Sequence, residues 1–129
     1  MILYYTNWNE HFGYKFSIDP TLASVPQWSK YEAFPPLSPR IAIANSRLFV
    51  QRLLTEVQPF DPLFSSVCLT SQSEHEVGWW YYVVKWFVPD LEDIAIDWSE
   101  FSVPVLFDGT TPVPTKFKYE DRSAVYRAS

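Results

Sequence analysis

The sequence predicts an α+β domain, in which a mostly antiparallel sheet is covered on one face by one main amphipathic helix at about residues 46–58. Three observations favour this class: runs of aromatic and β-branched residues recur along the chain, one segment has clear helical periodicity, and three glycines accompany eleven prolines. Scarce Gly with frequent Pro is typical of extended segments joined by stiff loops. A length of 129 residues suits one ordinary domain, so we expect residues 1–129 to fold as a single domain. An all-β barrel with an appended helix is the alternative.

The first third of the chain predicts two short strands followed by an irregular loop. Residues 2–6 and 14–18 have strand composition, and four prolines then interrupt any longer element up to residue 36. We expect the rings of this loop to fasten it to the core; they are Trp28, Tyr31 and Phe34. Residues 40–44 fit either a brief strand or a first helical turn, with Ser38 as cap and Pro39 at the first helical position.

The main helix is predicted from apolar residues that recur at three- and four-residue spacing. Six residues form this stripe, with arginine, glutamine and glutamate between them: Leu48, Phe49, Val50, Leu53, Leu54 and Val57. Asn45 or Ser46 can cap its start by accepting a free amide proton, and Pro59 closes the pattern.

The remaining elements are predicted to be strands. Residues 79–88 form the longest apolar run, and because both of its faces are apolar we expect this strand to be central in the sheet. Pro89-Asp90 marks a turn, and Asp108-Gly109 is a hairpin signal that the following Thr and Pro residues lengthen. Pro104 suggests an edge strand or a bulge. The other segments with strand composition are 64–70, 94–98, 101–107, 116–119 and 124–127.

Charge is distributed very unevenly along the chain. The formal net charge of −5 argues against binding of a phosphate backbone, because such binding needs clustered Lys and Arg. Residues 53–115 carry ten carboxylates and one cation, Lys85, whereas the segments on either side are each net positive. Five of those carboxylates lie within eleven residues: Asp90, Glu92, Asp93, Asp97 and Glu100.

The sequence contains no motif that names a reaction. It has no Gly-rich phosphate loop, dinucleotide fingerprint or nucleophile elbow, so we expect no cofactor and no enzymatic activity. His75 stands between Glu74 and Glu76, but neighbouring side chains in a surface turn do not converge on a metal. We expect the single cysteine, Cys68, to be a small buried hydrophobic residue. The amino-terminal segment lacks the features of a signal peptide and no run reaches the ~20 apolar residues of a membrane span, so a cytoplasmic location is expected.

The aromatic and acidic stretches together indicate a binding protein. Most rings of the 79–88 strand are expected to fill the core, but with six tryptophans we expect at least one ring to stay partly exposed, and Trp98 lies among the carboxylates. An acidic surface beside aromatic anchors suits a basic protein partner, such as a toxin or a nucleic-acid-binding enzyme. The predicted partner-binding residues are Asp90, Glu92, Asp93, Asp97, Trp98 and Glu100. One alternative is an inhibitor that mimics nucleic acid, and another is a small-molecule-binding or catalytic domain with a cavity lined by Trp79, Tyr81 or Tyr82.

Residues 38–127 resemble a family of domains of unknown function counted among the bacterial polymorphic-toxin immunity proteins. The resemblance lies in a capped helix, a Trp-Tyr-Tyr strand that leads to an Asp-rich segment with a serine at its end (Asp-x-x-Ser in the family), and a late strand with an Arg. In this chain these are Asn45-Ser-Arg-Leu-Phe-Val-Gln-Arg-Leu-Leu54, Asp93-Ile-Ala-Ile-Asp-Trp-Ser99 after the aromatic strand, and Val125-Tyr-Arg127. The resemblance implies a cytoplasmic antidote that binds a cognate toxin and has no catalytic activity of its own.

Overall fold

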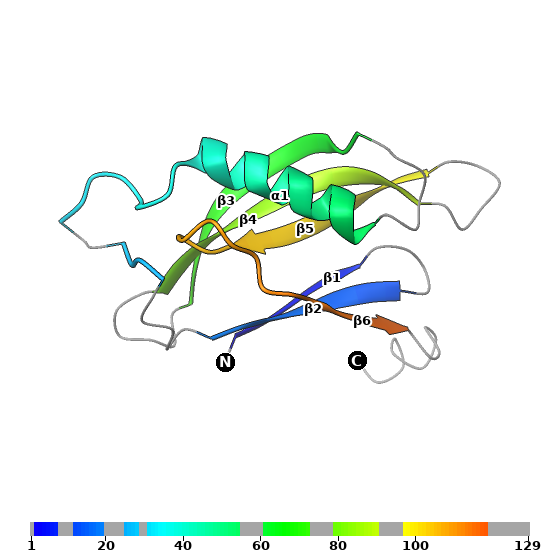
Figure 1. Ribbon diagram of the computed structural model, residues 1–129, viewed down its shortest axis with the longest axis horizontal. Coiled ribbons are helices and arrows are strands. Elements are labelled where there is room, and N and C mark those ends of the chain that lie inside the picture. The colour runs from blue at the N-terminus through cyan, green and yellow to red at the C-terminus, as the bar shows by residue number, and fades with distance from the viewer. Residues whose placement is uncertain are drawn as a thin grey trace.

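The fold consists of two three-stranded antiparallel sheets and one helix (Figure 1). The computed structural model describes residues 2–7, 12–19, 25–28, 31–54, 61–72, 79–90 and 97–118. One sheet has the order β1-β2-β6, formed by Ile2–Asn7, Phe12–Ile18 and Thr115–Lys118. The other has the order β3-β4-β5, formed by Leu63–Gln72, Trp79–Asp90 and Asp97–Val105, and the helix α1 spans Pro39–Leu53. The predicted α+β class is confirmed, and the described strands form no closed barrel.

The core lies where α1 and the two sheets meet. The helix packs on β4 and β5, and the β1-β2-β6 sheet approaches from the side of β5 (Figure 1). The two sheets are joined by a hydrogen bond of 2.9 Å from the Ser102 amide to the Thr6 hydroxyl. Ring contacts extend this junction, with centroids 5.7 Å apart for Tyr14 and Phe101. Phe16 of β2 is fully buried, so the first sheet closes one side of the core.

Strand β4 is central, as its two apolar faces predicted. Lys85 is paired with Ser66 of β3 on one side and with Ser102 of β5 on the other. Along the face that α1 covers, four β4 residues are at most 3% exposed: Tyr82, Val84, Trp86 and Val88. Their partners on β5 in the same face, Phe101, Val103 and Val105, are fully buried. The prediction that most rings of this strand fill the core is therefore confirmed for the face that α1 covers.

The helix begins two turns earlier than the sequence predicted. It starts at Pro39, and the Ser38 hydroxyl caps it by accepting the amide proton of Ile41 at 3.3 Å. Of the two interpretations of residues 40–44, the helical one is therefore right. The proposed caps Asn45 and Ser46 instead lie within the helix, where Ser46 is fully buried in line with Ala42 and Val50. The sequence predicted too late a start for the helix because its large apolar residues begin at residue 48. The first turns are buried through small residues instead.

The boundaries of the last strands also differ from the expectation. Strand β4 continues through Asp90, where a turn was predicted, and β5 runs without a break from Asp97 to Val105. Pro104 lies in β5, an edge strand of its sheet, which agrees with the missing amide of proline. Residues 94–96 and 124–127 lie outside the described residues.

The turn at Asp108-Gly109 is present, but it does not form a hairpin. The Gly109 amide donates to the Leu106 carbonyl at 2.9 Å, and Gly109 has a φ of 87°. Strands β5 and β6 on either side of this turn belong to different sheets, so the chain crosses from one sheet to the other here. Asp108 supports the turn by accepting from the Thr110 amide at 2.9 Å.

The loop rings behave in two ways. Trp28 packs edge-on against Trp80 with centroids 5.3 Å apart, as expected for a ring that fastens its loop to the core. Tyr31 and Phe34 are 87% and 81% exposed, so the same expectation is wrong for them. In the described part of the chain, no helix is both long and apolar enough to cross a membrane.

Candidate functional site: the open face of the second sheet

The face of the β3-β4-β5 sheet opposite α1 is covered at one end and open at the other. Along β4, Trp79, Tyr81 and Val83 on this face are at most 5% exposed, whereas Phe87 is 38% exposed. Because side chains on this face alternate with those under the helix, the open part begins at Lys85 and continues toward the end of β4.

Three large apolar side chains gather on the open part, one from each strand. Leu63, Phe87 and Trp98 are 54%, 38% and 48% exposed. Leu63 is paired with Phe87, which is paired with Glu100, and Trp98 precedes Glu100 by two residues on the same face of β5. We call this group of Leu63, Phe87 and Trp98 the end patch. Isolated exposed apolar residues are ordinary on a protein surface, but neighbours on adjacent strands that share one face form a continuous contact area.

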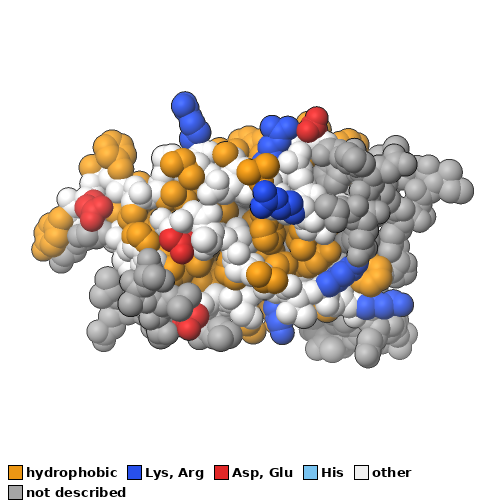
Figure 2. Space-filling view, in the orientation of Figure 1, with side chains coloured by type: hydrophobic (Ala, Val, Ile, Leu, Met, Phe, Trp, Pro, Cys, Tyr) orange, Lys and Arg blue, Asp and Glu red, His pale blue; other side chains and the backbone are white. Residues whose placement is uncertain are grey.

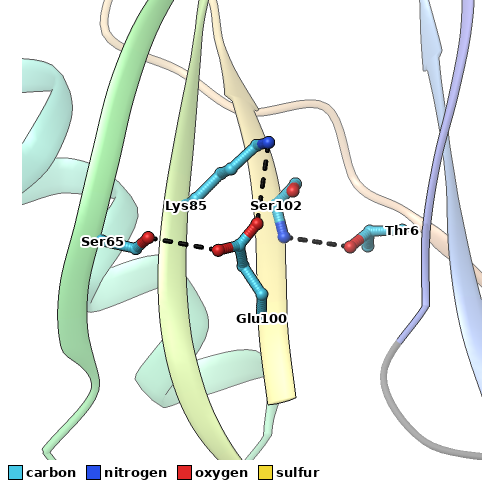
Figure 3. A network of polar contacts seen from close by, with 5 residues as sticks. All are labelled: Thr6, Ser65, Lys85, Glu100 and Ser102. Carbon is cyan, nitrogen blue, oxygen red and sulfur yellow. Dashed lines mark hydrogen bonds and ion pairs between the residues drawn. The ribbon is translucent and has the colours of Figure 1, made fainter.

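Glu100 lies beside the end patch and is already engaged (Figure 3). Its Oε1 is 3.6 Å from the Lys85 ammonium, and its Oε2 accepts a hydrogen bond of 3.2 Å from the Ser65 hydroxyl. The register of β3 and β4 shifts between Phe64 and Ser66, and this irregularity lets the Ser65 side chain reach across β4 to β5. The side chains of Lys85 and Glu100 are 39% and 43% exposed, so the ion pair is a surface pair worth about 1 kcal/mol or less.

The structure brings some of the predicted site residues together. Trp98 is half exposed, as expected, and shares its face with Glu100. Asp90 and Asp97 are paired in register at the ends of β4 and β5, directly beside the pair Pro89–Trp98. The structure does not describe the side chains of Asp90 and Asp97. Glu92 and Asp93 lie in segment 91–96, between these two strands in the sequence, which the structure does not describe either.

Sequence reasoning missed Leu63 and Phe87 as surface residues. A usable signal existed, because Lys85 lies between Val83 and Phe87 on one face of β4 and marks where that face leaves the core. Leu63 carries no such signal, since its exposure follows from the position of β3 at the edge of the sheet.

Cys68 is exposed rather than buried, which corrects the prediction from sequence. It lies on β3 opposite Val83, on the face away from α1. Among the described strands, β3 has a neighbour on one side only, because it is at the edge of its sheet. Within the described segments, no three His, Cys, Asp or Glu side chains come close enough to hold a metal ion.

On the other side of the sheet, helix α1 carries positive charge. Helix α1 contains Arg40, Arg47 and Arg52 and no acidic residue, and Arg47 contacts Asp61 at 3.1 Å. Figure 2 shows this side, where Lys and Arg side chains and a few Asp and Glu side chains are spread over a largely apolar and neutral surface.

A shallow hollow of about 240 Å³ lies between α1 and the turn that follows β5. It is lined by Asn45, Leu48, Phe49, Arg52, Gly109 and Thr111. None of the rings expected to line a cavity borders it, since Trp79, Tyr81 and Tyr82 are packed in the core at 5% exposure or less.

Comparison with known protein families, characterised proteins and solved structures finds no match to this chain.

Proposed function

We propose that this protein is a non-enzymatic binding protein that docks a cationic protein on the end patch, in the manner of an immunity-type inhibitor. The observation that carries the proposal is the end patch itself: Leu63, Phe87 and Trp98 come from three adjacent strands, share one face and are each between 38% and 54% exposed. Burying such a cluster provides the desolvated centre of an interface, for which aromatic side chains are the preferred anchors.

A cationic partner is favoured by the charge around the patch. The paired positions Asp90 and Asp97 adjoin Trp98 in the register of β4 and β5, and Glu92 and Asp93 lie between them in the sequence. Clustered carboxylates accelerate encounter with a positive surface and pair with its Lys and Arg after docking. Helix α1 carries three arginines, of which Arg47 pairs with Asp61, and it contributes no carboxylate of its own to such a partner.

The test compares Trp98→Ala with Tyr5→Ala as a matched control. Tyr5 is 56% exposed on β1 of the other sheet, so its replacement removes a similarly exposed ring away from the end patch. The tagged protein is used to capture partners from its native cells, and the captured protein is then purified for binding kinetics. We expect a basic protein that is retained by the Tyr5 variant and released faster by the Trp98 variant, with an association rate that falls as salt increases.

Two outcomes would contradict the proposal. If both variants release the partner at the wild-type rate, the end patch is not the interface. If binding does not weaken with salt and the partner is acidic, the assigned charge is wrong. Trp98→Ala should lower the free energy of unfolding by about 1–2 kcal/mol, because only buried tryptophans cost the full 3–5 kcal/mol, so the folded variant remains testable.

A further inference from the structure

The hollow between α1 and the turn after β5 has a shape that is fixed by hydrogen bonds. Within the turn, the Leu106 amide donates to the Thr110 carbonyl at 2.8 Å, and the Gly109 amide donates to the Leu106 carbonyl at 2.9 Å. The side-chain amide of Asn45 donates to the Gly109 carbonyl at 2.9 Å and so ties the turn to the helix. A site that is already formed loses little conformational freedom when a ligand enters it.

The walls of the hollow are apolar and accessible to an entering side chain. Leu48 is 50% exposed, and Phe49, whose ring centroid lies 6.1 Å from that of Phe16, is only partly buried. Gly109 adds no side chain, and a Cβ atom at this position would lie 3.0 Å from the Asn45 amide nitrogen. At about 240 Å³ the hollow is smaller than the ~300–1,000 Å³ of typical small-molecule sites, so one anchoring side chain fits it better than a whole cofactor.

The charge of the hollow is positive. Of the six described residues that line it, Arg52 alone is charged, and Arg52 is exposed. Within the described part of the chain Arg52 forms no ion pair, whereas Arg47 of the same helix contacts Asp61 at 3.1 Å. The adjoining carboxylate, Asp108, already accepts from the amide and the hydroxyl of Thr110 at 2.9 and 2.6 Å. A cation in the last turn also suits the helix dipole, but that effect leaves its N–H donors available to a carboxylate.

We propose that this hollow binds an acidic peptide segment of a partner protein. An apolar side chain of the segment enters between Leu48 and Phe49, and a neighbouring carboxylate pairs with the Arg52 guanidinium. Charge complementarity selects this occupant, because one arginine beside an apolar hollow matches a carboxylate next to an apolar residue. A phosphate backbone or an anionic membrane surface would need several clustered cations instead.

The hollow and the end patch are separate surfaces. The hollow borders α1, whereas the end patch lies on the face of the β3-β4-β5 sheet opposite α1. This inference is therefore independent of the proposed function, and Trp98→Ala should leave peptide binding at the hollow unchanged.

Titration of the ¹⁵N-labelled protein with short peptides, followed by amide chemical shifts, tests the proposal. The probe is acetyl-Leu-Asp-Glu-amide. Its matched controls are acetyl-Leu-Asn-Gln-amide, which lacks the charge, and acetyl-Ala-Asp-Glu-amide, which lacks the apolar anchor. We expect saturable shifts at Asn45, Arg52 and Gly109 with a Kd of about 1–10 mM, because one side chain and one ion pair only just offset the cost of association. Each control peptide should bind at least about threefold more weakly.

Two pairs of variants assign the contacts to the hollow. Arg52→Gln should weaken binding of the probe about threefold to tenfold and leave binding of the neutral peptide unchanged. Arg40→Gln is its matched control, since Arg40 is exposed on the same helix about 18 Å away at ~1.5 Å per residue. Leu48→Ala should also weaken binding of the probe, whereas Ile41→Ala should not, because Ile41 is 47% exposed outside the hollow. All four positions are exposed, so we expect the variants to fold.

Several outcomes would overturn the proposal. One is a neutral peptide that binds as tightly as the acidic probe, and another is an equal effect of Arg52→Gln and Arg40→Gln. The absence of any shift at the hollow up to the solubility limit of the probe would overturn it as well. Vesicles of phosphatidylglycerol or an oligothymidylate that shift the same signals where the probe does not would assign the hollow to a phosphate group instead.

Discussion

Ser46 provides a polar link between the helix and the central strand, and its removal gives the sharpest test of the core. The Trp86 indole donates to the Ser46 hydroxyl at 2.9 Å, and that hydroxyl donates to the Ile43 carbonyl at 3.0 Å. Ser46 is fully buried and Trp86 is 3% exposed, so water does not replace the hydroxyl when it is removed. Ser46→Ala therefore leaves a buried indole N–H without an acceptor.

The expected cost follows from three contributions. An unsatisfied buried donor costs about 1–3 kcal/mol. The Ile43 carbonyl loses little, because it also lies within the hydrogen-bonded body of the helix. Alanine has a higher helix propensity than serine, and this gain offsets roughly 0.5 kcal/mol of that cost. The net loss in free energy of unfolding is about 0.5–2.5 kcal/mol, which for a domain of this size lowers the Tm by roughly 2–12 °C.

The assay is urea unfolding followed by far-ultraviolet circular dichroism, which avoids the overlapping fluorescence of six tryptophans. Ala44→Ser is the matched control, since Ala44 is exposed on the same helix and the reverse change measures the propensity contribution alone. Combining Ser46→Ala with Trp86→Phe removes donor and acceptor together, and the penalty should then be smaller than the sum of the two single changes. If Ser46→Ala is as stable as the wild type after the propensity correction, the buried hydrogen bond contributes nothing and the reasoning fails.

Three further predictions concern positions around the core and the end patch. Burial raises the pKa of Tyr82 above its ordinary value. The stability that its protonated hydroxyl provides is therefore complete below pH ~10 and is lost as the pH rises toward the pKa of the folded state. Tyr82→Phe should flatten that alkaline loss of stability in melts recorded against pH. Gly109→Ala should lower the free energy of unfolding by roughly 1–2 kcal/mol in urea titrations, because φ is 87° and a Cβ atom would lie 3.0 Å from the Asn45 amide nitrogen. Lys85→Met should free the charge of Glu100 and raise the association rate with a cationic partner up to about fivefold at low salt in stopped-flow measurements, an effect that high salt should abolish.

The sequence predicted the parts of the fold that depend on local pattern. The apolar residues on both faces of β4 identified a central strand, since a strand with neighbours on both sides and cover on both faces over most of its length has such a pattern. The helix was predicted from its large apolar residues, but its start at Pro39 was not, because Ala42 and Ser46 bury their turns without bulky side chains.

The division of the strands into two sheets could not be predicted from the sequence. Gly109 and Asp108 specify a tight turn, and the same local signal serves a hairpin or a crossing between sheets. The choice depends on whether β6 gains more from pairing with β2 than with β5, a difference that arises from tertiary packing. The prediction that Cys68 is buried was wrong for a related reason, because apolar neighbours in the sequence do not reveal that its strand lies at an edge.

The candidate site was predictable only in part, and the structure changes which carboxylates matter. Trp98 could be chosen from sequence because it lies among acidic residues, yet Glu100 is held by Lys85 at 3.6 Å and by the Ser65 hydroxyl. A carboxylate that already has a cationic neighbour adds little long-range attraction for a partner. The steering charge of the proposed interface must then come from the residues at 90–97. Neutralising Asp90, Glu92 and Asp93 together should slow association far more than Glu100→Gln does, and the reverse ranking would separate the end patch from the acidic segment.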